Sequence, residues 1–210
     1  MRVRARLKKA HTIRAGRRLL WMALPTLTAL LLLAGVLLRL FGGPVDGATS
    51  GIGGPFRLVS GDGSLVTEQD FHGKYLLVYF GYTHCPDVCP TTLNDIAHAL
   101  TLLGPRAAHL QTLFITVDPK RDIPPLIEKY VAQFSPSIIG LTGSVAAIDA
   151  VEKQYRVDRD MVTSSDKEHS YTIDHTAVLY LMGPDGHFIT ALRASEGGAE
   201  MAATLAKFLP

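Results

Sequence analysis

The residues of this chain best suited to chemistry are two cysteines, Cys85 and Cys89, in the segment GYTHCPDVCP. They are the only cysteines in the sequence, and three residues separate them. A pair this close cannot staple distant parts of a chain, so it acts locally. As thiolates the two sulfurs suit a soft ion such as Cu(I), zinc also accepts them, and together they can form and break a disulfide. The pair therefore predicts metal binding, redox chemistry or both.

The cysteine segment lies between a predicted buried strand and a predicted helix. Residues 75–80 (YLLVYF) form a continuous apolar run, which is typical of a strand buried on both faces. A helix should run from residue 89 or 90 to residue 103, with Pro90 in its first turn. The run LFITV at 113–117 is the next buried strand, and a strand–helix–strand unit of this kind has parallel strands. The amino-terminal end of the helix would then stabilise a thiolate and lower its pKa.

The remaining elements complete the order of a thioredoxin-like fold. A β-hairpin is expected over residues 56–66, around the turn Gly61-Asp62-Gly63. The hydrophilic stretch 157–171 interrupts the order, and no strand is predicted in it. The other expected elements are a helix at 125–134, a strand at 138–141, a helix at 144–155, strands at 177–182 and 187–192, and a helix at 198–209. The predicted fold class is α/β, a three-layer α/β/α thioredoxin-like fold with an N-terminal β-hairpin, preceded by one transmembrane helix.

A metal site would need a third donor, because closed zinc sites use four ligands and only two cysteines are present. The histidines outside the basic amino-terminal segment are His72, His84, His98, His109, His169, His175 and His187. His175 is favoured, because it lies just before the penultimate strand, and in a thioredoxin-like fold that position faces the cysteine loop. His84 is less favoured, because adjacent residues rarely chelate the same ion.

Four further residues have both a structural and a functional interpretation. His169 and Met161 lie in the hydrophilic stretch and are candidate extra donors, although solvated loop residues are the simpler interpretation. Asp118 and Asp87 carry carboxylates, which are poor ligands for Cu(I). Asp118 follows the second central strand, where it either caps a turn before the next helix or tunes the charge of the site. Asp87, inside the cysteine loop, has the same two interpretations.

The amino-terminal quarter of the chain predicts a membrane anchor. Residues 1–18 carry eight Lys or Arg and no acid, and residues 19–38 carry no charge. At ~1.5 Å per residue, such a helix spans the ~30 Å core of a bilayer, and the basic block stays cytoplasmic. We predict a cytoplasmic basic segment at 1–18, a transmembrane anchor at 19–40, a Gly-rich tether at 41–54 and a thioredoxin-like domain at 55–210. A cleaved secretory signal is the alternative, less favoured because its apolar core would be only ~7–15 residues long.

The charge of the exported part argues against nucleic acid as a partner. From Phe41 onward there are 12 basic and 19 acidic residues, a balance of −7. Binding to phosphates requires clustered Lys and Arg, so this balance disfavours a nucleic-acid-binding domain. Outside the cytosol the two cysteines can also be oxidised.

Several segments resemble the Sco/SenC family, in the same order along the chain. They are FGYTHCPDVCP at 80–90, VDPKRDIP at 117–124, YTIDHTAVLYLMGPDG at 171–186, and in the leading hairpin GPF at 54–56 and DFHGK at 70–74. The resemblance implies a membrane-anchored copper chaperone that serves assembly of the binuclear copper centre in subunit II of haem–copper (cytochrome c) oxidase. It also implies that Cys85, Cys89 and His175 hold the copper; the two thiolates suit Cu(I), and the sequence leaves Cu(II) open as a second form.

The resemblance leaves a second function open, because some members of the family are argued to act as thiol reductases. In that alternative the protein is a membrane-anchored thiol–disulfide oxidoreductase, and Cys85 and Cys89 are catalytic residues that reduce the cysteines of the oxidase subunit. Another copper chaperone or a thioredoxin-like reductant would be a further partner. The short basic leader favours a single-pass protein of a bacterial inner membrane with a periplasmic domain over a mitochondrial one. A metallochaperone, which is not an enzyme, is the favoured interpretation.

Overall fold

Two parallel strands joined by one helix form the centre of the computed structural model, which describes residues 51–163 and 171–210. Strand β3 (Tyr75–Gly81) pairs with β4 (Leu110–Thr116) along its whole length, and α2 (Val88–Leu103) connects them. The prediction of a parallel strand–helix–strand unit is therefore confirmed. β4 begins earlier than predicted, because its first residues continue the pairing with the start of β3. A short 3-10 helix, η2 (Gly104–His109), leads from α2 into β4.

The main sheet has seven strands in the order β2-β1-β5-β4-β3-β8-β9. β5 is parallel to β4, whereas β8 is antiparallel to β3 and β9 to β8. The predicted N-terminal hairpin joins the sheet through β1, which pairs antiparallel with β5, and η1 (Glu68–Phe71) follows it. The bounds of these strands are β1 (Arg57–Ser60), β2 (Leu65–Thr67), β5 (Ile138–Thr142), β8 (Val178–Met182) and β9 (Phe188–Arg193).

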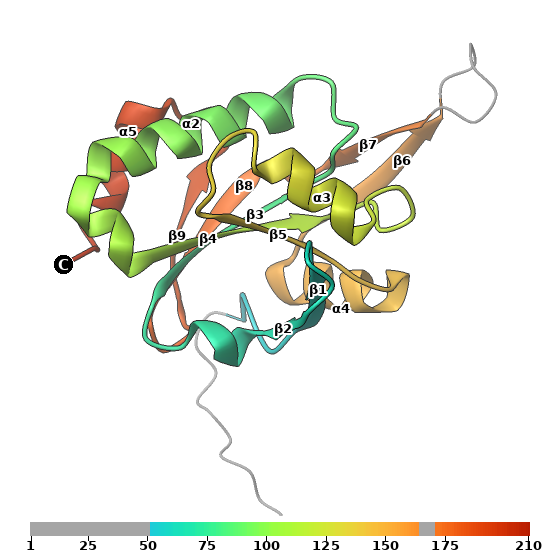
Figure 1. Cartoon of the computed structure of the whole chain (residues 1–210), viewed down its shortest axis with the longest axis horizontal. Coiled ribbons are helices and arrows are strands. Elements are labelled where there is room, and N and C mark those ends of the chain that lie inside the picture. Colours follow the sequence, from blue (N-terminus) through green and yellow to red (C-terminus); the bar gives the residue numbers. More distant parts are fainter. Residues whose placement is uncertain (1–50, 164–170) are drawn as a thin grey trace, which may run out of the picture. The chain divides into compact units, whose positions relative to one another are not determined.

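Helices cover both faces of the sheet, as predicted for three layers (Figure 1). Successive side chains of β3 point to opposite faces, so Tyr79 and Phe80 enter different clusters. Tyr79 packs on Phe114 of β4, with ring centroids 5.9 Å apart, on the side of α2 and α3. Phe80 packs on Tyr155 of α4 at 5.3 Å, on the other side. The bounds are α3 (Pro124–Val131), α4 (Val145–Tyr155) and α5 (Gly198–Leu205), so α3 and α5 end a few residues earlier than predicted.

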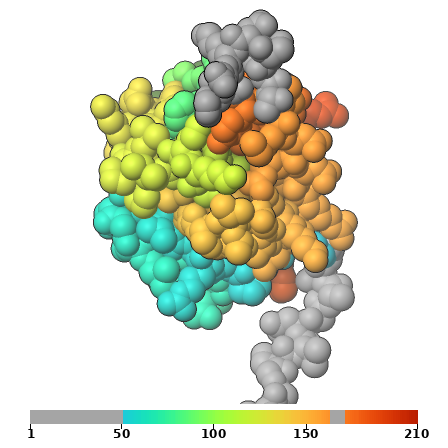
Figure 2. All heavy atoms as spheres, turned by 90° about the vertical axis from the view of Figure 1, so that its right-hand side faces the viewer, coloured from blue at the N-terminus to red at the C-terminus, as the bar shows by residue number. Residues whose placement is uncertain are grey.

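The hydrophilic stretch contains a strand that the sequence analysis missed. β6 (Arg159–Thr163) pairs antiparallel with β7 (Tyr171–His175) in a separate two-stranded sheet, with Arg159 opposite His175. This hairpin extends beyond the main sheet (Figure 1), and α4 and β6 lie next to each other on the surface seen from that side (Figure 2). In β6 residues 159–162 are half-buried or exposed, so backbone pairing defines this strand, whereas β7 buries only Ile173.

The predicted segments at 1–18 and 19–40, and most of the predicted tether at 41–54, lie outside the described residues. None of the helices within 51–163 and 171–210 has the length and apolar character needed to cross a membrane. The assignment of residues 19–40 as a membrane anchor therefore stays a prediction.

The close approach of α5 to α2 generates a test of the packing. A Cβ added at Gly198 would lie 2.7 Å from the backbone oxygen of Asp95 and 2.8 Å from the Cβ of His98, both on α2. We expect Gly198→Ala to lower the free energy of unfolding by ~1–3 kcal/mol, because the helices must move apart. Gly197 has ordinary backbone angles and no atom within 4 Å of an added Cβ, so Gly197→Ala should change it by less than ~1 kcal/mol. Urea unfolding of the full chain in mild detergent measures both, and equal effects would contradict the packing argument.

Candidate metal and thiol site

The cysteine loop lies where β3 and β4 end side by side. Gly81, the last residue of β3, pairs with Thr116, and its carbonyl oxygen accepts a hydrogen bond of 2.8 Å from the amide of Val117. The chain then turns, because the amide of Cys85 donates to the carbonyl oxygen of Tyr82 at 3.2 Å. This four-residue turn places Cys85 just ahead of the amino terminus of α2, as the sequence analysis predicted.

The two cysteines differ in exposure. Cys85 is partly exposed, Cys89 is completely buried, and both are free thiols. The amide of Cys89, in the first turn of α2, donates to the sulfur of Cys85 at 3.4 Å. Asp87 holds the capping position of the helix but makes no side-chain cap bond. The sulfur of Cys85 therefore accepts from one of the free amides at the helix start, which favours its thiolate form.

This difference is reflected in the acidity of the two thiols. Hydrogen bonds from the Cys89 thiol and from backbone amides, together with the nearby His175, lower the pKa of Cys85 to about 5 against the opposing effect of burial. The pKa of Cys89 is raised, because its thiol donates a hydrogen bond to the Cys85 sulfur and because it is buried. At neutral pH the pair therefore holds one thiolate, on the more exposed sulfur.

His175, the favoured third donor, lies beside the cysteines. Its Nε2 is 3.9 Å from the sulfur of Cys89, and its Nδ1 is 3.1 Å from the carbonyl oxygen of Thr176. A carbonyl oxygen only accepts, so in the neutral ring Nδ1 carries the proton and the lone pair of Nε2 faces the sulfur. The ring of Tyr82 contacts the imidazole edge-on, with centroids 6.1 Å apart. As predicted, His175 lies just before the penultimate strand, β8, and it is also the last residue of the additional strand β7.

An open pocket of ≈ 370 Å³ lies between the cysteine loop and β7. With ~2.3 Å to sulfur and ~2.0 Å to nitrogen, an ion bound to both atoms would hold them roughly 3.5–3.9 Å apart, close to the distance between Cys89 and His175. In the part of the chain that the structure describes, no three Cys, His, Asp or Glu side chains are yet gathered as in a formed metal centre. The candidate donors are thus near one another but do not surround a single metal position. The lining residues are Tyr82, Cys85, Pro86, Asp87, Val88, Thr172, Ile173, Asp174, His175 and Ala177.

The other candidates lie elsewhere or serve the fold. The ring of His84 points to Asp122, with 3.8 Å between Nδ1 and Oδ1, and does not line the pocket. Asp118 is buried in an ion pair with Arg121, and its backbone closes a turn, in keeping with the structural interpretation. Met161 is exposed on β6, and His169 lies outside the described residues.

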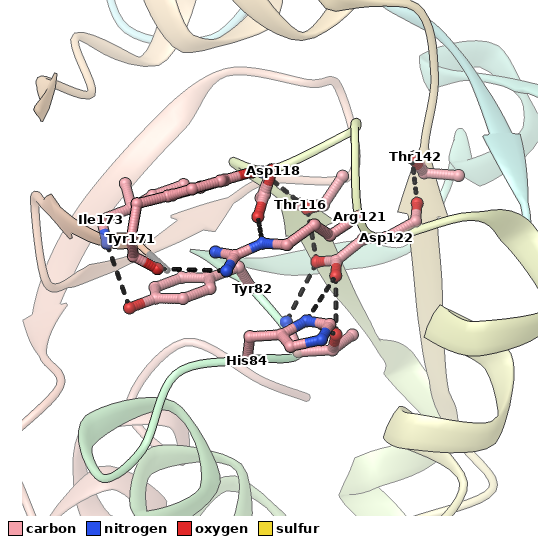
Figure 3. A network of polar contacts seen from close by, with 10 residues as sticks. Tyr82, His84, Thr116, Asp118, Arg121, Asp122, Thr142, Tyr171 and Ile173 are labelled. Carbon is pink, nitrogen blue, oxygen red and sulfur yellow. Dashed lines mark hydrogen bonds and ion pairs between the residues drawn. The ribbon is translucent and has the colours of Figure 1, made fainter. Parts of the chain in front are cut away.

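A polar network next to the site was missed by the sequence analysis (Figure 3). The guanidinium of Arg121 lies 3.7 Å from the ring centre of Tyr171 and donates to its carbonyl oxygen at 3.1 Å. The hydroxyl of Tyr171 donates to Asp118 at 2.8 Å, and that of Tyr82 accepts from the amide of Ile173 at 3.2 Å. These contacts hold β7, and with it His175, against the ends of β3 and β4. The sequence analysis considered the run DPKRD at 118–122, but it did not predict β7, the strand that this run contacts.

The fold and the site together define a class: a thioredoxin-like domain with a Cys-x3-Cys pair at a helix start and a histidine opposite it. The profile of the SCO1/SenC family matches residues 45–210. The chain belongs to this family, as the resemblance of its motifs implied.

Similarity to individual proteins supports the assignment. The chain is 40% identical over 157 residues to "Protein SCO1 homolog, mitochondrial" of Mus musculus, covering 74% of this chain and 55% of that protein. It is 38% identical over 149 residues to an SCO2-like protein of Rickettsia prowazekii, covering 69% of this chain and 73% of that protein. The structure of Bradyrhizobium japonicum ScoI, solved with copper bound, is similar with a TM-score of 0.69 and 43% identity, covering 75% of this chain and 99% of that one. The chain spans about half the length of the mouse relative.

The asymmetry of the two thiols can be tested by alkylation of the reduced, metal-free protein. We expect Cys85 to react with iodoacetamide at a rate that rises with pH, with a midpoint near its pKa of about 5, while buried Cys89 stays unmodified. Peptide mass spectrometry would locate the modification. In Cys89→Ala, which removes the donating thiol, the midpoint should move upward. A wild-type midpoint near the ~8.5 of an ordinary cysteine would contradict the thiolate assignment.

Proposed function

We propose that this protein is a copper-binding metallochaperone in which Cys85, Cys89 and His175 bind the ion. The observation that carries the proposal is the position of the His175 Nε2 atom, 3.9 Å from the sulfur of Cys89, at the mouth of an open pocket. The three residues come from two segments 86 positions apart in the chain, joined only by the fold. Membership of the SCO1/SenC family supports the same role, since a copper-bound relative is known.

The donor set favours copper over the other common ions. Two thiolates and one imidazole are soft and borderline donors, which suit Cu(I), and the imidazole also suits Cu(II). A structural zinc site would require a fourth protein ligand, and the two carboxylates that line the pocket, Asp87 and Asp174, are exposed to solvent. Copper is here the cargo of the protein, held by few ligands.

The exposure of the donors supports delivery of the ion. Cys89 is anchored in the core, whereas Cys85 and His175 are partly exposed on either side of the pocket. A partner's ligands can therefore approach the ion from the open side before these ligands leave. We propose cytochrome c oxidase subunit II, with its binuclear copper centre, as the receiving partner. This proposal rests on the family resemblance. Anchoring of the domain to a membrane by residues 19–40, with the site on the periplasmic side, rests on the uncharged segment that follows the basic block.

A thiol–disulfide oxidoreductase is a second candidate, favoured by the asymmetry of the two cysteines. Cys85 is an accessible thiolate, the form that attacks a disulfide, and Cys89 is a buried thiol close to it. Cys85 would form a mixed disulfide with one sulfur of the partner and release the other as a thiol. Cys89 would then displace the second partner thiol, so that the partner disulfide is reduced and this pair is oxidised. His175 would not be needed for this exchange.

Copper titration of the reduced full chain in detergent tests the chaperone. We expect one Cu(I) per chain, and we expect His175→Ala to weaken binding by more than the ~100-fold typical of residues outside the ligand shell. His72→Ala, which removes an exposed histidine of another part of the fold, should leave the affinity unchanged. Wild-type affinity in His175→Ala would refute its assignment as a ligand.

The reductase alternative is tested on the same variants. A cysteine pair in the copper-binding domain of the oxidase subunit, oxidised to a disulfide, serves as the substrate, and the release of its thiols is followed with time. If reduction is fast in both wild type and His175→Ala while neither binds copper, the reductase is the correct function. Copper binding without measurable reduction supports the chaperone.

A further inference from the structure

We propose that Asp122 is a positioning residue for the copper site: its buried carboxylate fixes the turn that presents Cys85. This inference rests on the proposed copper-binding function and deepens it. Asp122 lies in the segment that follows β4, on the sheet edge where the cysteine loop also lies. Its side chain is completely buried. A charged group in such a position needs hydrogen-bond donors around it, and these donors show which segments of the chain the carboxylate holds in place.

Two of the donors come from the cysteine loop. The amide of Thr83 donates to Oδ2 of Asp122 at 3.0 Å, and the hydroxyl of Thr83 donates to Oδ1 at 2.6 Å (Figure 3). Thr83 is the second residue of the turn closed by the bond between Cys85 and Tyr82. By holding both the main chain and the side chain of Thr83, the carboxylate fixes the corner of the turn from which Cys85 projects.

The carboxylate is itself held firmly by the central strands. The hydroxyl of Thr116, the last residue of β4, donates to Oδ2 at 2.7 Å. The hydroxyl of Thr142, the last residue of β5, donates to the backbone oxygen of Asp122 at 2.7 Å, and the amide of Asp122 donates to the backbone oxygen of Asp118 at 2.9 Å. Asp122 therefore links the cysteine loop to two strands of the core.

The preceding residue holds the other half of the site. Arg121 contacts Tyr171 at the start of β7, the strand that ends in His175. Adjacent residues of one short segment thus hold the cysteine side and the histidine side of the pocket, which keeps the donors at a fixed separation. Outer residues that orient metal ligands in this way typically account for a ~10–100-fold difference in affinity.

The choice of an aspartate has a chemical reason. The amide of Thr83 can only donate, and the hydroxyls of Thr83 and Thr116 donate here, so a carboxylate accepts from all three. Asn has the same shape as Asp, but its NH2 group either faces the Thr83 amide or requires the Thr83 hydroxyl to turn from donor to acceptor, and the negative charge is lost. Asp122→Asn should therefore weaken the hold on Thr83 without opening a cavity.

The experiment compares Asp122→Asn with wild type in the reduced full chain in detergent. The first measurement is the Kd for Cu(I), in competition with a chromophoric Cu(I) chelator, and we expect a ~10–100-fold increase. The second is amide hydrogen exchange of the metal-free protein, in which a peptide covering residues 82–85 should lose protection while peptides of β4 do not. Thr83→Ala should show smaller changes of the same kind, and Thr83→Ser, which keeps the hydroxyl, should behave as wild type.

The chain offers a matched control in Asp70→Asn. Asp70 also accepts from the amide and the hydroxyl of one threonine, Thr67, at 2.7 and 3.0 Å, but at the N-terminal hairpin and exposed to solvent. This variant should change neither the Kd nor the exchange of residues 82–85. If it weakens copper binding as much as Asp122→Asn does, the effect is not specific to the cysteine loop and the proposal fails.

Each outcome decides the role of Asp122. A wild-type Kd in folded Asp122→Asn, or a loss that only matches its unfolded fraction by circular dichroism, overturns the proposal. If wild type itself binds no Cu(I), the proposed function fails, and the role of Asp122 is decided by amide exchange of residues 82–85 alone. Retained protection of these amides in Asp122→Asn then overturns the positioning role, and lost protection supports it. If Asp122→Asn does not fold, the pair Thr83→Ala and Thr83→Ser decides by the same two measurements.

Discussion

The parallel pairing of β3 with β4 is the constraint on which the site depends. Parallel strands end at the same edge of a sheet, so the loops that follow β3 and β4 must meet there. The hydrogen bond from the Val117 amide to the Gly81 carbonyl is the last one between the two strands, and the two loops diverge directly after it. The first loop carries the cysteines and the second carries Arg121 and Asp122. Without the in-register pairing, neither the hydrogen bonds to Thr83 nor those to Tyr171 could form.

The strand–helix junction also explains why two cysteines of similar sequence context behave differently. Cys89 belongs to the buried face of α2, and an added Cβ at Gly81 would lie only 2.9 Å from its sulfur, so it has no room to move. Cys85 precedes the helix and receives one of its free amides. One sulfur is therefore fixed by packing and the other by hydrogen bonds. A soft ion or a partner's sulfur would therefore reach the sulfur of Cys85 first.

Much of the fold could be predicted because its central strands carry continuous apolar runs. YLLVYF and LFITV are buried on both faces, and the helix between them has a proline in its first turn and a glycine at its end, so their type and order follow from local patterns. The region of His175 was predicted from topology. The β6–β7 hairpin was missed, since exposed strands show little apolar alternation. The contacts of Asp122 were missed for another reason: Thr83 is 39 positions away, and local sequence carries no signal for a polar contact across the fold.

The position of His175, the proposed third ligand, depends on a separate two-stranded sheet. A two-stranded hairpin is only marginally stable by itself, so the place of His175 depends on contacts made by its neighbours. Arg159, opposite His175 in the hairpin, donates to the carbonyl oxygen of Val117 and to Asp149, each at 2.7 Å. It also lies 3.3 Å from Glu152, but burial raises the pKa of that carboxyl to about 7, so this ion pair is only partly charged near neutral pH. The hydrogen bond from Arg159 to the carbonyl oxygen of Val117 does not depend on pH in this range. Val117 lies in the segment that leads from β4 to Asp122. The histidine segment and the cysteine loop are therefore both held by residues that follow the end of β4.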